Sequence, residues 1–204
     1  GDRKLEPGDL KYKDLNGDGK INQGKNTVDD PGDFKIIGNN RSRYLYGLDL
    51  NADWNGFDLR VLFQGVGKRD WYPFSTAHAQ FFGIYASPWV NVYENILDHW
   101  TPENPDGYFP RLKSYTAFGA GDLSYNQTRY LQNAAYLRCK NITLGYTLPK
   151  QLLQKIKLNN VRVYFSGENI FDFRSFCKNV DAEMFDKSTY TMQRTLSIGL
   201  NISL

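Results

Sequence analysis

The last segment of the chain alternates strictly between apolar and polar residues. Every second position from 196 onward holds a large aliphatic side chain: Leu196, Ile198, Leu200, Ile202 and Leu204. The residues between them are all small or polar. Because successive side chains of a β-strand point to opposite faces, this period of two predicts a strand with one apolar and one polar face.

Four earlier stretches show the same alternation and the same two kinds of face. Their apolar positions are Tyr44, Tyr46, Leu48 and Leu50; Phe57, Leu59, Val61 and Phe63; Ile142, Leu144, Tyr146 and Leu148; and Val161, Val163 and Phe165. The opposite faces carry charged or polar residues, among them Arg43, Asp49, Asp58, Arg60, Arg162 and Glu168. In a transmembrane β-barrel such apolar faces meet lipid and the polar faces line the lumen. A soluble β-sandwich, with its apolar faces buried, is the alternative.

The connections between these stretches alternate between long and short. The pair Asn55-Gly56 is typical of a hairpin turn, and residues 149–159 are also a short connection. Membrane barrels combine short periplasmic turns with longer extracellular loops. We therefore predict an all-β chain with an extracellular loop over 1–40, a hairpin over 41–66, a long extracellular loop over 67–133 and three last strands over 134–204.

Composition excludes several classes of protein. The net charge of +3 is too small to argue for nucleic acid as a partner. No run approaches the roughly 18 apolar residues of a membrane-spanning helix, and the mean hydropathy is −0.57. The opening residues lack the apolar run of a signal peptide, as expected for a mature exported chain or an internal fragment. Cys139 and Cys177 are too few for a disulfide scaffold, and we expect free thiols.

Residues 14–22 fit the first part of an EF-hand-like calcium loop. Side-chain oxygens stand at alternate positions, Gly19 allows the sharp turn, and the next backbone carbonyl turns inward. Lys25 occupies the place of the final bidentate acid, so one of Asp29, Asp30 or Asp33 would have to fold back. The predicted ligands of Ca²⁺ are Asp14, Asn16, Asp18, Lys20 and Asp30. A turn that binds no metal is the alternative.

The sequence offers no arrangement of catalytic residues. His78 and His99 have no acid or cysteine at ligand spacing, and no nucleophile, base and acid follow one another in a known order. We therefore expect that the chain is not an enzyme. A secreted or surface carbohydrate-binding β-domain with a calcium loop is the second candidate, and such a domain would need no detergent for extraction.

Several motifs resemble one family. The end of the chain looks like the assembly signal of outer-membrane barrels, with Ser197, Gly199, Ile202 and Leu204 at the signal positions, although the usual last residue is aromatic. The other matching segments are 14–22, Gly32-Asp33, 36–39, 46–48, 56–59, 63–65, 100–105, 136–149 and 167–171. Together they are similar to the C-terminal part of SusC-type TonB-dependent outer-membrane transporters.

The resemblance implies both a fold and a function. It implies that the chain contributes the last strands of an antiparallel barrel of about 22 strands, completed by the rest of its own barrel and a plug. Such a protein imports oligosaccharides or peptides across the outer membrane of a Gram-negative bacterium, with energy relayed through TonB. The expected partners are a SusD-like surface lipoprotein acting as a lid, the lipid membrane and the transported substrate.

Overall fold

The chain divides into two compact units in the computed structural model. The loop unit comprises Gly1–Asn39, Trp71–Leu131 and Asp186–Ser188, and the sheet unit comprises Asn40–Asp70, Gln132–Phe185 and Thr189–Leu204. The structure describes residues 5–73, 81–86, 89, 91–113, 123, 125–155, 157–175, 180–181, 183–184 and 192–203.

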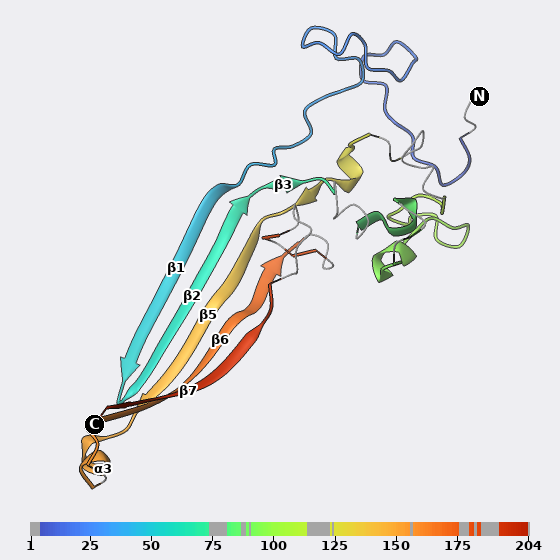
Figure 1. The fold of residues 1–204 in the computed structure, drawn as a ribbon. Coiled ribbons are helices and arrows are strands. Elements are labelled where there is room, and N and C mark those ends of the chain that lie inside the picture. The colour runs from blue at the N-terminus through green and yellow to red at the C-terminus, as the bar shows by residue number, and fades with distance from the viewer. Residues whose placement is uncertain are drawn as a thin grey trace. The chain divides into compact units, whose positions relative to one another are not determined.

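One antiparallel sheet of five strands dominates the sheet unit (Figure 1). Its strands are β1 (Arg43–Trp54), β2 (Phe57–Lys68), β5 (Tyr136–Thr147), β6 (Asn160–Arg174) and β7 (Thr195–Ser203). Their order in the sheet, β1-β2-β5-β6-β7, is also their order along the chain, so each strand pairs with its predecessor. The prediction of an all-β antiparallel fold is confirmed.

Two strands are longer than the alternation indicated. β5 begins at Tyr136, whereas its alternating pattern starts at Asn141, and β6 continues to Arg174, into the segment expected to be a loop. Next to β2, the register of β5 shifts: Leu62 pairs with Asn141 but Phe63 pairs with Cys139, which leaves Lys140 as an extra residue. A bulge of this kind adds a residue to one strand and reverses the alternation beyond it. The pattern therefore breaks at Lys140 although the strand continues.

The remaining elements of the described chain are short. The strands β3 (Asp70–Trp71) and β4 (Gln132–Asn133) pair with each other, and α3 (Lys150–Lys155) connects β5 to β6. Three 3₁₀ turns, η1 (Gly83–Tyr85), η2 (Glu94–Leu97) and η3 (Thr128–Tyr130), lie in the loop unit. No helix in the described ranges is long and apolar enough to cross a membrane.

Aromatic side chains form the core of the loop unit. The most deeply buried are Phe81, Phe82, Tyr85, Phe109 and Tyr130. The ring of Phe109 stacks on that of Tyr130, with centroids 5.6 Å apart, and the hydroxyl of Tyr85 donates to the carbonyl of Pro110 at 2.6 Å. Aromatic contacts of this kind contribute beyond the area that they bury. The described rings of the long segment 67–133 thus pack largely against one another.

An ion pair on the polar face joins two strands that are not neighbours. Asp58 of β2 accepts from Nε of Arg162 of β6 at 2.8 Å, so the pair crosses the intervening strand β5. Gly145 of β5 lies beneath it, and a Cβ there would stand 2.5 Å from Nη2 of Arg162 and overlap the carboxylate of Asp58. The missing side chain therefore makes room for the ion pair.

We predict that Gly145→Ala destabilises the sheet by up to about 1 kcal/mol, because the added methyl group displaces the ends of the partly exposed ion pair. Thermal unfolding of the purified full-length protein measures the change. Gly47→Ala in β1 is the matched control, since a Cβ there would meet only the carbonyl of Phe63 at an ordinary 3.6 Å. Equal unfolding temperatures for the two variants would contradict this role of Gly145.

Candidate functional site

One whole face of the five-stranded sheet is apolar and exposed. Residues that pair directly across an antiparallel sheet share a face, and the register aligns Leu50, Val61 and Ile142 in one such row and Leu144, Phe165 and Ile198 in another. The exposed fraction is 48% for Leu144, 42% for Phe165 and 82% for Ile198. Folding places the predicted apolar positions on one surface and leaves most of them exposed or partly exposed, although Val161 is buried.

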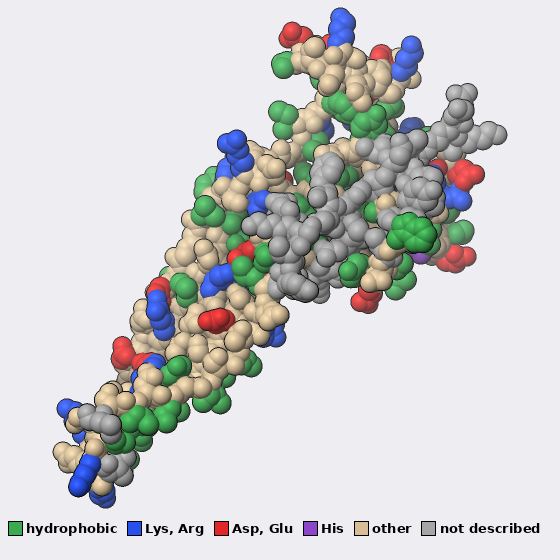
Figure 2. All heavy atoms as spheres, viewed as in Figure 1, with side chains coloured by type: hydrophobic (Ala, Val, Ile, Leu, Met, Phe, Trp, Pro, Cys, Tyr) green, Lys and Arg blue, Asp and Glu red, His purple; other side chains and the backbone are tan. Residues whose placement is uncertain are grey.

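The opposite face carries the polar side chains predicted for a lumen. Figure 2 shows charged side chains spread along the sheet. Arg60 donates to Asp49 through Nε at 3.1 Å, and the side chains of Thr143 and Ser166 lie within hydrogen-bond distance at 3.2 Å. The two faces of the sheet thus require different surroundings, one apolar and one polar.

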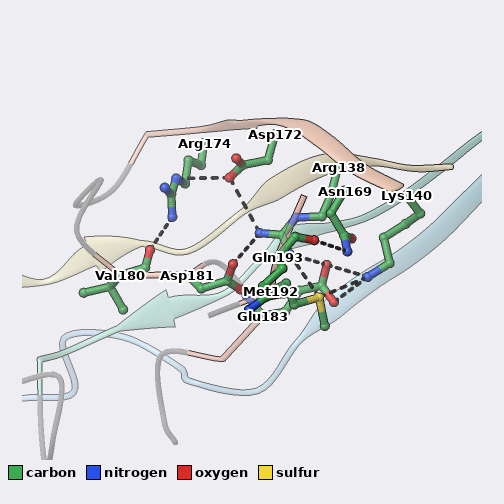
Figure 3. A network of polar contacts seen from close by, with 10 residues as sticks. All are labelled: Arg138, Lys140, Asn169, Asp172, Arg174, Val180, Asp181, Glu183, Met192 and Gln193. Carbon is green, nitrogen blue, oxygen red and sulfur yellow. Dashed lines mark hydrogen bonds and ion pairs between the residues drawn. The ribbon is translucent and has the colours of Figure 1, made fainter. Parts of the chain in front are cut away.

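A network of charged side chains fixes the segment after β6 to the polar face (Figure 3). Nη2 of Arg138 in β5 lies 2.8 Å from Oδ2 of Asp181, and Nη1 lies 3.2 Å from Oε1 of Glu183. The ammonium group of Lys140, at the bulge, also reaches Glu183 at 2.9 Å. The basic residues belong to a strand and both acids to the connection between β6 and β7.

Further contacts extend this network along β6. Asp172 lies 4.0 Å from Arg138 and 3.0 Å from Nε of Arg174, whose Nη1 donates to the carbonyl of Val180. Three basic and three acidic side chains therefore balance in charge. The Arg138 side chain is only 5% exposed. A buried guanidinium group is tolerated only with such partners, because isolated charge is costly to remove from water.

The predicted calcium loop folds around the carboxylate of Asp14. This carboxylate accepts the N–H of Gly17 at 2.6 Å and that of Gly19 at 2.8 Å. Asn16 and Asp18 likewise accept N–H bonds from within the loop. Apart from Asp30, the predicted calcium ligands therefore lie on one tight turn: Asp14, Asn16, Asp18 and Lys20. Carboxylate, amide and carbonyl oxygens are the donors that Ca²⁺ prefers, and each carboxylate keeps lone pairs beyond these bonds.

Asp33 is the acid that folds back onto this turn. Its two carboxylate oxygens accept the N–H groups of Leu15 at 2.7 Å and Asn22 at 2.8 Å. These bonds hold the pKa of Asp33 below its usual value of 3.8. The N–H of Asp30 instead donates to Thr27 within the following turn. Among the described residues, no three His, Cys, Asp or Glu side chains are grouped to hold a metal.

A cleft of about 240 Å³ opens beside this turn within the loop unit. Its walls include the rings of Tyr12, Phe34 and Tyr125, and the centroids of Phe34 and Tyr125 are 5.5 Å apart. The side-chain amide of Gln23 donates to the hydroxyl of Tyr125 at 3.1 Å. Ring faces beside amide groups suit an amphipathic ligand such as a sugar or a peptide.

One histidine and one cysteine lie among the described residues. Nδ1 of His99 lies 2.9 Å from the carbonyl of Ile96, which places this ring within its own turn. Cys139 is buried and unpaired. The predictions for His78 and Cys177 lie outside the described residues.

The chain is similar to named receptors over nearly its whole length. It is 25% identical to TonB-dependent receptor P26 of Formosa agariphila, over 96% of this chain and 20% of that protein. It is 26% identical to TonB-dependent receptor SusC of Bacteroides thetaiotaomicron, over 98% of this chain and 18% of the receptor. No protein-family model matches. The resemblance predicted from the motifs is confirmed, and the chain spans about a fifth of the length of these relatives.

A solved structure shows the same fold. The RagAB peptide importer in its closed-closed state superposes with a TM-score of 0.60, over 87% of this chain and 19% of the neighbour, at 22% sequence identity. The partial coverage in sequence and in structure fits a C-terminal portion of a TonB-dependent transporter barrel.

We predict that Arg138→Met costs about 3–5 kcal/mol in the free energy of unfolding, because Asp181 and Glu183 lose a buried partner. The connection between β6 and β7 should also become open to protease cleavage in the folded protein. Denaturant unfolding and limited proteolysis measure the two effects. Arg60→Met is the control: its ion pair is exposed, and exposed pairs contribute about 0–1 kcal/mol. Unchanged protease resistance in Arg138→Met would show that the network does not hold this segment.

Proposed function

We propose that this chain is the C-terminal part of an outer-membrane active transporter. The transporter imports oligosaccharides or peptides in a Gram-negative bacterium with energy from TonB. The exposed apolar face of the sheet carries this proposal. Five strands present aliphatic and aromatic side chains on one side, far more than the scattered apolar residues of a soluble surface.

The covering that a soluble sandwich requires is not found in the described chain. A sandwich packs a second sheet against the apolar face, but the only other sheet among the described residues is the pair β3-β4, with two residues in each strand. Lipid is the other environment in which such a face is stable. There the backbone groups must also be paired, as they are between neighbouring strands of a barrel.

The edges of the sheet support its place in a larger barrel. β1 and β7 are the two outer strands, and each pairs with one neighbour only in the described chain. An unpaired edge at membrane depth is costly because its N–H and C=O groups have no water to bind. We propose that further strands of the same protein pair with both edges and close a barrel of about 22 strands around a plug.

The loop unit supports the proposed partners. Its aromatic core gives the segments around it a packed structure of their own, and the cleft beside Phe34 provides a first contact for substrate. We propose that this unit lies outside the cell and docks a SusD-like lipoprotein, with residues 91–113 in the contact. Loss of lipoprotein co-purification after replacement of this segment by a short linker tests the assignment.

We also propose that Ca²⁺ stiffens the first loop. Asp14, Asn16, Asp18 and the carbonyl of Lys20 would hold the ion. We assign the completing carboxylate to Asp33 in place of the expected Asp30, because Asp33 is the acid that contacts the turn. The ion would supply positive charge beside the carboxylates of Asp14 and Asp18. Its role here is structural.

The lipid assignment predicts effects of different size at two neighbouring residues of β7. Ile198→Arg should cost about 2–4 kcal/mol near the bilayer midplane, because it places a charge in lipid. Ser197→Arg, which projects from the polar face opposite Ser166, should cost much less. Insertion into the outer membrane and resistance to denaturant measure the cost of each substitution. Equal tolerance of the two variants would refute the membrane face.

The calcium assignment predicts that a chelator loosens protease protection of residues 14–33. Asp33→Asn should weaken calcium binding, because an amide has one acceptor oxygen for two N–H groups. Asp29→Asn, an exposed acid in the next turn, is the matched control. The lowered pKa of Asp33 means that its contribution is complete above pH 3.8 and is lost as the pH falls through the lower value. Protease protection that is unchanged both by the chelator and by Asp33→Asn would exclude the metal.

A further inference from the structure

The helix α3 lies at the end of the sheet where an aromatic row crosses the strands. Trp54, Phe57 and Tyr146 are successive partners on the apolar face, and the rings of Phe57 and Tyr146 are 4.5 Å apart. Tryptophan and tyrosine gather where a membrane meets water. The connection from β5 to β6 begins directly after this row, and so α3 stands at the level expected for lipid headgroups.

Burial shows where α3 packs against the sheet. Val161, at the start of β6, belongs to the apolar face through its partner Ile202. Ile202 is 54% exposed, but Val161 is only 7% exposed and the neighbouring Leu153 of α3 only 2%. Val161 is therefore buried on the apolar face near the point where α3 contacts β6. Leu152 of α3, which is 51% exposed, adds apolar surface at this end of the sheet.

The polar side chains of this connection are all neutral or basic. Lys150, Lys155 and Lys157 are exposed, and no Asp or Glu occurs between Pro149 and Gly167. Their ammonium groups have no ion pair or hydrogen bond with any part of the chain that the structure describes. Figure 2 shows basic side chains gathered at this end of the molecule. The acids of the nearby hairpin, Asp53 and Asp58, lie on the opposite, polar face.

We propose that Lys150, Lys155 and Lys157 form a binding site for the phosphate groups of anionic phospholipids at the periplasmic surface of the outer membrane. Leu152 enters the apolar layer beside the site, and Leu153 fixes the helix to the sheet. The proposal rests on the proposed membrane function. Strong positive charge, an exposed leucine and contact with the lipid side of the sheet together match a charged headgroup above an acyl chain.

Lys157 provides a way to remove charge without disturbing the fold. Its φ is +54°, a left-handed conformation that ends the helix, and the N–H of Leu158 then bonds to the carbonyl of Leu153 at 3.1 Å. Glycine adopts this conformation without strain. Lys157→Gly should therefore keep or improve the helix end while it removes one of the three charges.

The test places a photoactivatable residue at the exposed Gln151 of the full-length receptor, reconstituted in vesicles of phosphatidylcholine and phosphatidylglycerol. We expect preferential cross-linking to phosphatidylglycerol. Each lysine neutralised should lower this preference by up to about fivefold, in Lys157→Gly and in the triple variant Lys150→Gln, Lys155→Gln, Lys157→Gln. A higher salt concentration should also lower the preference for phosphatidylglycerol. The charge-matched control is Lys11→Gln, Lys25→Gln, Lys35→Gln in the loop unit.

Two outcomes overturn the proposal. One is an unchanged lipid preference in the triple variant, and the other is an equal fall in the loop-unit control. A second photoactivatable residue at Ile198 separates this failure from failure of the membrane function. If Ile198 cross-links to lipid but Gln151 shows no preference for phosphatidylglycerol, the membrane function is supported and the lysine site is refuted. Absence of lipid cross-links at both positions overturns both.

Discussion

The register of the five strands is the constraint on which the rest of this structure depends. Each strand pairs with the next so that apolar residues meet apolar residues across four successive interfaces. Side chains alternate with a period of two, so a slip of one residue in any interface would turn charged residues toward the apolar face. The separate environments of the two faces, the exposed band and the ion pairs all require that this register is kept.

Two local devices hold the register where alternation alone would not. Glycine at position 145 lets Asp58 and Arg162 join β2 to β6 over the strand between them, which fixes three strands against one another. The ring of Tyr164 in β6 occupies the corresponding space above Gly199 in β7. Gly199 thus has a packing role, since any Cβ there would overlap that ring.

The bulge at Lys140 separates the sheet into two functional regions. On one side of it the polar face is open and carries ion pairs between strands. On the other side the face is covered by the segment that follows β6, held by Arg138 and its acidic partners. Arg138 and Lys140, two residues apart in β5, both contact Glu183. Without the extra residue, both side chains would share the apolar face of Ile142 and Leu144, because alternate residues of a regular strand lie on one face.

Sequence alone determined the five alternating strands, the two faces and the family resemblance, because a period of two is a local property of the chain. It also identified the turn around Asp14, whose spacing is local. It did not reveal the ends of β5 and β6, since the bulge reverses the alternation at Lys140. Asp181, a partner of Arg138, lies 43 residues away along the chain, and the choice of Asp33 over Asp30 depends on how a second turn folds back. Contacts of this kind exist only once distant segments meet, and the tertiary structure decided them.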